Sequence, residues 1–214
     1  MSENLFPDIT VGIVHSRDGM TSDGETTWLQ KAINSVSKQL CPSNIDLIVI
    51  DNMDRKKSIG RCYNEIVESA KNNWIFFLGD DDYIQPDYLT ALLSWLVELQ
   101  QGGADPPESY IHVTGFCTAF STEIEEGKVH KVPLQRLPQG MWSRDYVLKN
   151  RFNEDLKRYV DVELFDRANE DPNANLVSVD WNYGYYYRQH DGELANVSGN
   201  KIREYIAAGG EVQK

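Results

Sequence analysis

The sequence predicts an α/β fold in which a mostly parallel sheet is flanked by helices. Short apolar runs alternate with helix-period stretches through the first half of the chain, which is the pattern of strands joined by helical crossovers. Polar side chains of ligand type follow each of the first three runs, at the sheet edge where such folds bind ligands. The 214 residues show no repeat, low-complexity segment or interdomain linker, so we expect one domain spanning residues 1–214.

The first half is expected to contain three strands and three helices. The apolar run at 74–78 is too short for a globular helix and stops at Gly79, so it favours a buried strand. The segment 58–71 places apolar residues on one helical face. Strands that alternate with helices are expected to pair in parallel. The expected strands are 8–15, 45–50 and 74–78, and the expected helices are 27–40, 58–71 and 88–98.

The second half is less regular. Its Gly and Pro content predicts a loop at 101–109. The aromatic-rich stretch at 180–187 favours an ordinary packed strand, because aromatic residues favour strands in general. The expected strands are 110–120, 128–134, 177–179 and 183–189, and the expected short helices are 143–149 and 160–168.

Composition and charge limit the classes of function. The net charge of −12 disfavours nucleic acid as the main ligand, because a field of that sign repels phosphate backbones. No apolar run approaches the ~20 residues that cross a bilayer, and the N-terminus lacks a signal-peptide pattern, so we expect a cytoplasmic protein without a transmembrane segment. The three cysteines, Cys41, Cys62 and Cys117, are too widely spaced for a disulfide framework or a structural zinc site.

The triplet Asp80-Asp81-Asp82 directly follows the apolar run at 74–78. Three adjacent anions repel one another, so a fold that gathers them supplies a cation or a hydrogen-bonding ligand. In an extended chain Asp80 and Asp82 would share one face and Asp81 the other. Such an Asp-X-Asp pair offers the hard oxygen ligands that Mg²⁺ or Mn²⁺ prefers when it carries a phosphorylated ligand. The alternative is a solvated acidic turn before a helix.

Two further candidate positions, His15–Arg17 and Asp51–Asn52, follow the other two expected strands. Asp51 is placed where an acidic residue can bind a ribose or a base edge. The sequence after the first strand lacks a G-x-G-x-x-G loop, which excludes a Rossmann dehydrogenase from the leading hypotheses. Neither a P-loop nor a G-x-S-x-G elbow occurs in the chain.

These motifs, taken in order, resemble the landmarks of the GT-A glycosyltransferases, in particular the inverting family 2 enzymes. The Asp-X-Asp landmark with Pro86 and Leu89 after it matches closely, and the strand end at Asp51 is a looser match. A catalytic Glu-Asp pair of the family corresponds here to Val160 and Asp161. The similar segments are 13–17, 33–39, 50–54, 61–64, 77–82, 144–148, 152–154, 160–167 and 187–192.

The resemblance implies a GT-A-like, Rossmann-like fold with an irregular acceptor-side C-terminal half. Residues of about 8–100 would form the nucleotide-sugar-binding half, about 101–198 the acceptor and catalytic half, and 199–214 a C-terminal tail. The implied function is metal-dependent, inverting transfer of a sugar from a nucleoside diphosphate donor, with UDP the expected nucleotide and Mn²⁺ or Mg²⁺ the cofactor. The acceptor would be a hydroxyl of a glycan, a lipid-linked saccharide or another molecule.

The resemblance also implies roles for individual residues. Asp82 would hold the metal ion, joined by His190 from the late Tyr-Arg-x-His motif. The remaining donor-binding positions are His15, Arg17, Asp51, Arg61, Asp80 and Asp81, with Asp51 reading the base, Arg61 against the base or phosphates, and Asp80 contacting the ribose or sharing the ion. Trp142 and Trp181 would shape an acceptor pocket, although each is also a candidate core residue.

Asp161 matches the general base that would deprotonate the acceptor hydroxyl. Asp155 and Glu163 are the alternatives, and Asp161 is equally placed to be a carboxylate that only stabilises a helix N-terminus. Two other functions stay open on the same residues. One is a metal-dependent nucleotidyltransferase, which would release pyrophosphate from a nucleoside triphosphate. The other is a non-catalytic protein that binds a nucleotide sugar or carbohydrate on the same scaffold.

Overall fold

The computed structural model describes residues 6–21, 24–102, 110–114, 116–121, 129–133, 140–157, 159–174, 176–180, 184–189 and 212–213. The first half contains β1 (Ile9–His15), α1 (Trp28–Ser37), β2 (Ile45–Asp51), α2 (Ile59–Ser69), β3 (Trp74–Gly79), β4 (Tyr83–Ile84) and α3 (Tyr88–Gln101). The second half contains β5 (Tyr110–Thr114), β6 (Phe116–Ser121), β7 (Val129–Pro133), β8 (Met141–Ser143), α4 (Arg144–Asn150), α5 (Val160–Glu170), β9 (Leu176–Asp180), β10 (Tyr185–Gln189) and β11 (Val212–Gln213).

The main sheet has six strands in the order β2-β1-β3-β8-β5-β9. β1 pairs in parallel with both β2 and β3, β5 pairs in parallel with β9, and β8 runs antiparallel to its two neighbours. A second sheet has the order β11-β7-β6-β10-β4, in which β10 is antiparallel to the short β4. β4 begins directly after Asp82, so the second sheet starts where the acidic triplet ends.

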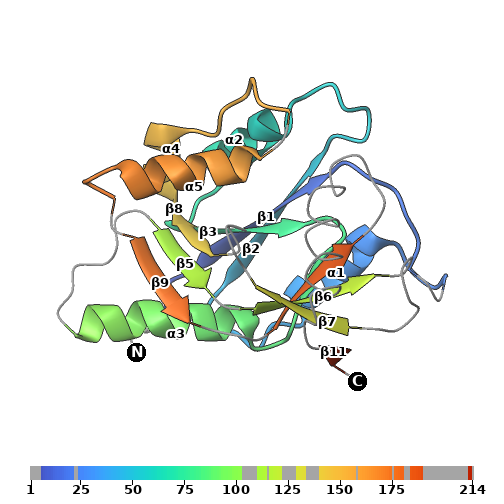
Figure 1. Cartoon of the computed structure of the whole chain (residues 1–214), viewed down its shortest axis with the longest axis horizontal. Helices are drawn as coiled ribbons and strands as arrows, with labels where there is room; N and C mark the ends of the chain where they lie inside the picture. The colour runs from blue at the N-terminus through green and yellow to red at the C-terminus, as the bar shows by residue number, and fades with distance from the viewer. Residues whose placement is uncertain are drawn as a thin grey trace.

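Helices cover both faces of the main sheet (Figure 1). One hydrophobic cluster joins α1 and α3 to inward-facing residues of β1 such as Val11 and Ile13, while the other joins α2, α4 and α5 to residues such as Val14 and Ile75. In Figure 1, α2, α4 and α5 lie together along one side, and α3 lies along the other. Burial on both faces explains why β1 and β3 read as continuous apolar runs rather than alternating ones.

The starts of the early helices follow directly from the sequence. Thr27 and Ser58 precede α1 and α2, and their hydroxyl oxygens accept hydrogen bonds from the backbone N–H groups of Gln30 and Arg61. These bonds satisfy donors that have no partner inside the helix. Ser143 caps α4 in the same way.

The predicted fold class is confirmed: the structure is an α/β protein with a mostly parallel sheet flanked by helices. One expected element is wrong, because the strand predicted at 110–120 is two strands, β5 and β6, which belong to different sheets. The short strands β4, β8 and β11 were not expected, since two or three residues are too few to show a periodic pattern.

Gly60, in the first turn of α2, packs directly on the backbone of the segment between α4 and α5. A Cβ at this position would lie 2.5 Å from the carbonyl oxygen of Asn153, and backbone cannot move aside as a flexible side chain can. We therefore expect Gly60→Ala to lower the free energy of unfolding by about 1–3 kcal/mol. Urea denaturation measures the loss, and Ser69→Ala, at the exposed end of the same helix, is the control that should show none. Equal stability of both variants would contradict this close packing.

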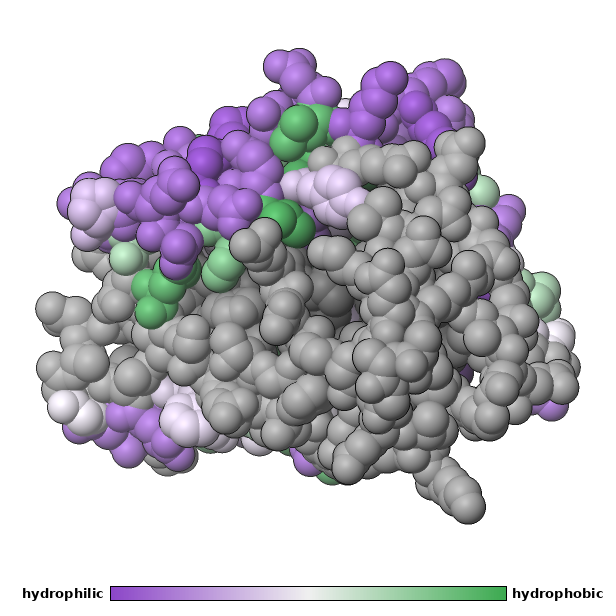
Figure 2. Space-filling model, viewed as in Figure 1, coloured by the Kyte–Doolittle hydropathy of each residue, from purple (hydrophilic) through white to green (hydrophobic). Residues whose placement is uncertain are grey.

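No helix in the described part of the chain is both long and apolar enough to cross a membrane. Figure 2 shows hydrophilic side chains spread over the face of the α4–α5 layer, broken by a few apolar residues.

Candidate functional site

The carboxyl ends of the three parallel strands meet at one edge of the main sheet. His15 lies opposite Asp51 in the β1–β2 register, and Val14 lies opposite Gly79 in the β1–β3 register. Asp80 therefore leaves the sheet beside His15. The backbone N–H of Asn52 donates to the carbonyl oxygen of His15, which ties the second strand end to the first.

Asp80 joins the end of β3 to the turn that follows β1. Its Oδ2 accepts hydrogen bonds from the backbone N–H groups of Ser16 (2.7 Å) and Arg17 (3.1 Å), and it lies 3.5 Å from Nδ1 of His15. Burial and the neighbouring charge of Asp81 raise the pKa of Asp80, while the two N–H donors oppose that rise. Asp80 and the His15–Arg17 turn are thus in direct contact, as expected for strand ends that meet at one edge, and their role in ligand binding stays a prediction.

Asp81 is the acidic residue that faces two arginines. Its Oδ2 lies 3.2 Å from Nη1 of Arg17 and 3.9 Å from Nη1 of Arg188 on β10. The guanidinium of Arg188 in turn stacks over the ring of Trp28, with its central carbon 4.2 Å from the ring centroid. The site therefore brings together two cations that are far apart in sequence, and Arg188 was not among the expected site residues.

Asp82 is almost fully buried. Its Oδ2 accepts a hydrogen bond from the hydroxyl of Tyr185 (2.7 Å) and its Oδ1 accepts one from the backbone N–H of Arg188 (2.8 Å). Burial first, and then the charge of Asp81, raise the pKa of Asp82. These contacts arise because β10 pairs with β4, which starts one residue later.

Asp80 and Asp82 were expected to share one face of an extended chain, and this expectation is wrong. The chain turns at Asp80 and Asp81, and the backbone N–H of Asp82 donates to the carbonyl oxygen of Gly79 (3.3 Å). Asp80 and Asp82 are both buried, but they bind different strands: Asp80 binds the turn after β1 and Asp82 binds β10. The turn separates the three carboxylates and gives each its own partner.

The donor set of the triplet fits a hard divalent cation. The charge of Asp81 raises the pKa of both Asp80 and Asp82, so an added positive charge would relieve this repulsion. Each oxygen of an ionised carboxylate has two lone pairs, and the hydrogen bonds from Tyr185 and Arg188 to Asp82 use one on each oxygen. Within the described ranges, no group of three His, Cys, Asp or Glu side chains is arranged to hold a metal ion. His190, the second expected ligand, lies outside the described residues, so the metal site stays a prediction.

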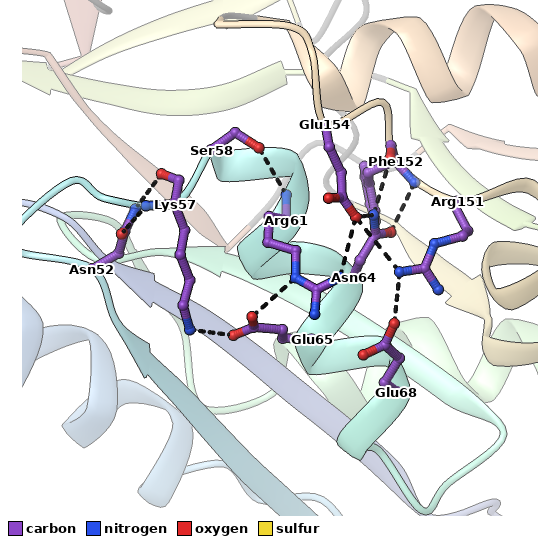
Figure 3. Close-up of polar contacts among 10 residues, drawn as sticks. All are labelled: Asn52, Lys57, Ser58, Arg61, Asn64, Glu65, Glu68, Arg151, Phe152 and Glu154. Atoms are coloured by element: carbon purple, nitrogen blue, oxygen red, sulfur yellow. Dashed lines mark hydrogen bonds and ion pairs between the residues drawn. The ribbon is translucent and has the colours of Figure 1, made fainter.

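Asp51 and Arg61 occupy the neighbouring strand end and helix start. Asp51 is exposed, and its Oδ1 accepts a hydrogen bond from the backbone N–H of Met53 (3.1 Å). The guanidinium of Arg61 lies 3.1 Å from a carboxylate oxygen of Glu65 and 3.6 Å from one of Glu154 (Figure 3). Arg61 thus belongs to a surface ion-pair network, and its predicted contact with the nucleotide stays a prediction.

Asp161 lies in the first turn of α5 and is partly buried. Burial raises its pKa, and a hydrogen bond from the backbone N–H of Val162 to Oδ1 (2.9 Å) opposes that rise. Burial and then the charges of Asp161, Asp80 and Asp82 raise the pKa of the Tyr63 hydroxyl. Tyr63 therefore lies in the field of both the candidate base and the acidic triplet, which connects α5 with the strand-end site.

The two alternatives to Asp161 are in different surroundings. Both carboxylate oxygens of Glu163 are paired with Arg167, at 2.7 and 3.1 Å. Asp155 is exposed on the segment before α5. A general base gains from burial that raises its pKa toward neutrality, and burial raises the pKa of Asp161.

Sequence reasoning missed Tyr185 and Tyr63. Tyr185 lies in the aromatic stretch that was interpreted as a packed strand and is part of β10, but its hydroxyl also binds Asp82. The expected role of Trp142 in an acceptor pocket is wrong, because this side chain is only 1% exposed and packs against Tyr146 and Phe152. Trp181 lies outside the described residues.

The chain was compared with known proteins. No protein-family model matches it, and no curated protein matches its sequence. Among solved structures, S. aureus TarS 1-349 in complex with UDP-GlcNAc superposes with a TM-score of 0.62 at 14% identity, covering 94% of this chain and 66% of that one. TarS 1-349 in complex with UDP gives 0.59 at 14% identity, covering 93% and 70%. TarS 1-349 alone gives 0.55 at 14% identity, covering 85% and 60%.

This likeness shows a shared fold. The chain spans between 60% and 70% of the length of those three TarS chains.

Proposed function

We propose that this protein is a glycosyltransferase that moves a sugar from a nucleoside diphosphate donor to an acceptor hydroxyl, with inversion at the anomeric carbon. One observation carries the proposal: Asp80, Asp81 and Asp82 stand at the carboxyl edge of a parallel sheet, together with the turn after β1 and two arginines. Ligands of open α/β sheets bind at this edge. The fold is shared with TarS structures that hold UDP-GlcNAc and UDP, which supports UDP as the nucleotide.

The charges at the edge suit a diphosphate leaving group. Arg17 and Arg188 both reach the carboxylate of Asp81 and present guanidinium groups that bind phosphate oxygens in a fork. Mn²⁺ or Mg²⁺ held by Asp82 and its neighbours would supply neutralisation of the charge that develops on the departing diphosphate. Asp80 keeps Ser16 and Arg17 in place through their backbone N–H groups.

Asp161 is proposed to remove the proton of the acceptor hydroxyl. Inversion requires this base to act on the face of the sugar opposite the leaving group. α5 and the acidic triplet belong to different elements, and the proposal requires that the sugar lie between them, with the base on one side and the diphosphate-binding residues on the other.

A thermal-shift panel tests the donor proposal. We expect UDP at ~100 times its dissociation constant to stabilise the protein by roughly 2.7 kcal/mol in the presence of Mn²⁺, and to do so far less in excess chelator. Asp82→Asn keeps the shape of the side chain and should lose the Mn²⁺-dependent part. Asp87→Asn, an exposed carboxylate just before α3, is the matched control and should behave as the wild type.

The same panel separates the rival functions. A shift with nucleoside triphosphates alone would favour the nucleotidyltransferase. A UDP shift without release of UDP from UDP-GlcNAc or another UDP sugar would favour a non-catalytic binding protein. If no nucleotide shifts the melting temperature, the proposed donor site is wrong.

A further inference from the structure

Helix α5, which carries Asp161, is tied to the end of α4 by one side chain. Arg167 donates from Nη1 to the carbonyl oxygen of Asn150 and from Nη2 to that of Arg151, both at 2.6 Å. Glu163, one helical turn earlier, holds the same guanidinium with both carboxylate oxygens. The two carbonyls lie at the end of α4, where no intrahelical donor remains for them, so Arg167 also caps that helix.

Asn64 on helix α2 binds the backbone of Phe152, the residue that follows Arg151. The side-chain amide of Asn64 accepts from the backbone N–H of Phe152 (2.9 Å) and donates to its carbonyl oxygen (3.0 Å). The amide also donates to Oε1 of Glu154 (2.8 Å). Figure 3 shows Asn64 pointing from α2 toward Phe152 and Glu154. Asn64 is 1% exposed, and a buried amide with its donors and acceptor used in this way fixes one backbone position.

The contacts of Arg167 and those of Asn64, called the two clamps below, hold three consecutive residues, 150–152. Arg151, in the middle, has a φ of 26°, and Tyr159, just before α5, has a φ of 58°, values that L residues rarely adopt. Such strained positions persist only where the surroundings hold them. The position of Phe152 is also fixed by its ring, which packs on Tyr63 and Phe77 at 5.0 and 5.3 Å between ring centroids.

The first turn of α5 is held by packing rather than by a side-chain cap, since Val160 and Leu164 are buried in the hydrophobic cluster that also contains Phe152. Its N-cap residue, Tyr159, makes no side-chain capping bond, unlike Thr27, Ser58 and Ser143 before the other helices. The orientation of this turn therefore depends on that packing, on the contacts made farther along α5 and on the segment that leads into it.

We propose that Asn64 and Arg167 are positioning residues that set the place of Asp161 by clamping residues 150–152 from α2 and from α5. Glu163 acts through Arg167, which gives this carboxylate a role other than that of the base. The inference rests on the proposed function only where it treats Asp161 as the base. Displacing a catalytic group by about 1 Å can cost ~100-fold in rate, so a clamp of this kind bears directly on turnover.

Two conservative variants test the clamp. Arg167→Lys keeps the charge but loses the planar fork that reaches two carbonyls and Glu163 together. Asn64→Asp keeps the size and an acceptor for Phe152 N–H but cannot donate to its carbonyl oxygen. Asp166→Asn, exposed on α5 beside Arg167, is the control.

Two readouts are measured on each full-length variant. The first is amide hydrogen exchange, where we expect exchange across 160–164 to quicken at least ~10-fold in Arg167→Lys while β1 and β3 exchange as in the wild type. The second is UDP release from UDP-GlcNAc, where we expect kcat to fall roughly 10- to 100-fold with KM nearly unchanged. The control should match the wild type in both.

The outcomes separate this inference from the proposed function. Unchanged exchange across 160–164 in Arg167→Lys, with folding retained, would overturn the clamp whatever the activity. Faster exchange with unchanged kcat would overturn the positioning role. If the wild type releases no UDP, the proposed function is in question, and the exchange result still decides whether the clamp exists. Arg167→Lys keeps the test valid if Asn64→Asp fails to fold.

Discussion

Asp161→Asn is expected to abolish turnover while leaving donor binding intact. A positioned general base contributes typically 10²–10⁴-fold to the rate, so we expect kcat to fall about 10³-fold. UDP should still stabilise the variant as it does the wild type, because Asp161 lies on α5 whereas the proposed phosphate-binding residues lie at the strand ends and on β10. UDP release from a UDP sugar and the thermal shift with UDP measure the two effects separately.

The shifted pKa of Asp161 adds a test of pH dependence. Burial raises its pKa in the folded protein above the ordinary value near 3.8, so the base is ionised only at higher pH and kcat/KM should fall as the pH is lowered through the raised pKa. A carboxyl group whose pKa is higher in the folded than in the unfolded protein stabilises the fold while it is protonated. This contribution is complete at a pH below the unfolded pKa, and it is lost as the pH rises through the folded pKa. Asp161→Asn should therefore melt at a higher temperature than the wild type at pH 7, and the difference should vanish in acid.

If Asp161→Asn turned over as fast as the wild type, Asp161 would not be the base. The turnover of Asp155→Asn and of Glu163→Gln would then be compared with that of the wild type. The clamp predicts that Glu163→Gln loses part of kcat through Arg167, whereas loss of a general base would remove nearly all of it. A lower melting temperature of Asp161→Asn at pH 7 would show that this carboxylate stabilises the fold instead of straining it.

Asp80→Ala is expected to lose both stability and donor binding. The substitution leaves the backbone N–H groups of Ser16 and Arg17 without their acceptor, and an unsatisfied buried donor costs about 1–3 kcal/mol. Two fully buried donors would together cost roughly 2–6 kcal/mol, but these two are only partly buried and the repulsion with Asp81 is relieved, so we expect the free energy of unfolding to fall by roughly 2–4 kcal/mol. The freed turn would no longer hold Arg17 at the site. Urea denaturation and UDP titration measure the losses.

Asp80→Asn is the matched control, because its amide oxygen still accepts from the same two N–H groups. It should keep most of the stability and lose only the part of donor binding that depends on the charge. If Asp80→Ala unfolds at the wild-type urea concentration, the hydrogen bonds from Ser16 and Arg17 do not hold the turn. If it binds UDP as the wild type does, the turn is not part of the donor site.

Much of the site was predictable because the end of a strand is marked by residues that are neighbours in the sequence. The apolar run before Asp80 and the one before Asp51 show in the sequence, and parallel pairing then brings their ends to one edge. The amphipathic spacing of α2 and the caps at Thr27 and Ser58 likewise depend only on residues close together in the sequence. The places of Arg188 and Tyr185 were not predictable in this way, because they depend on β10 pairing with a two-residue strand.

The sequence by itself determined the α/β class, the order of the main elements and the edge at which the carboxylates gather, since these follow from short-range periodicity and from where each strand stops. Only the tertiary structure decided which partners the carboxylates have: Asp80 with the turn after β1, Asp81 with two arginines, and Asp82 with Tyr185. It also decided that Glu163 is paired with Arg167 while Asp161 is not paired with any described cation. The physical reason is that partner choice and burial depend on residues far apart in the chain, which the sequence pattern around each carboxylate does not encode.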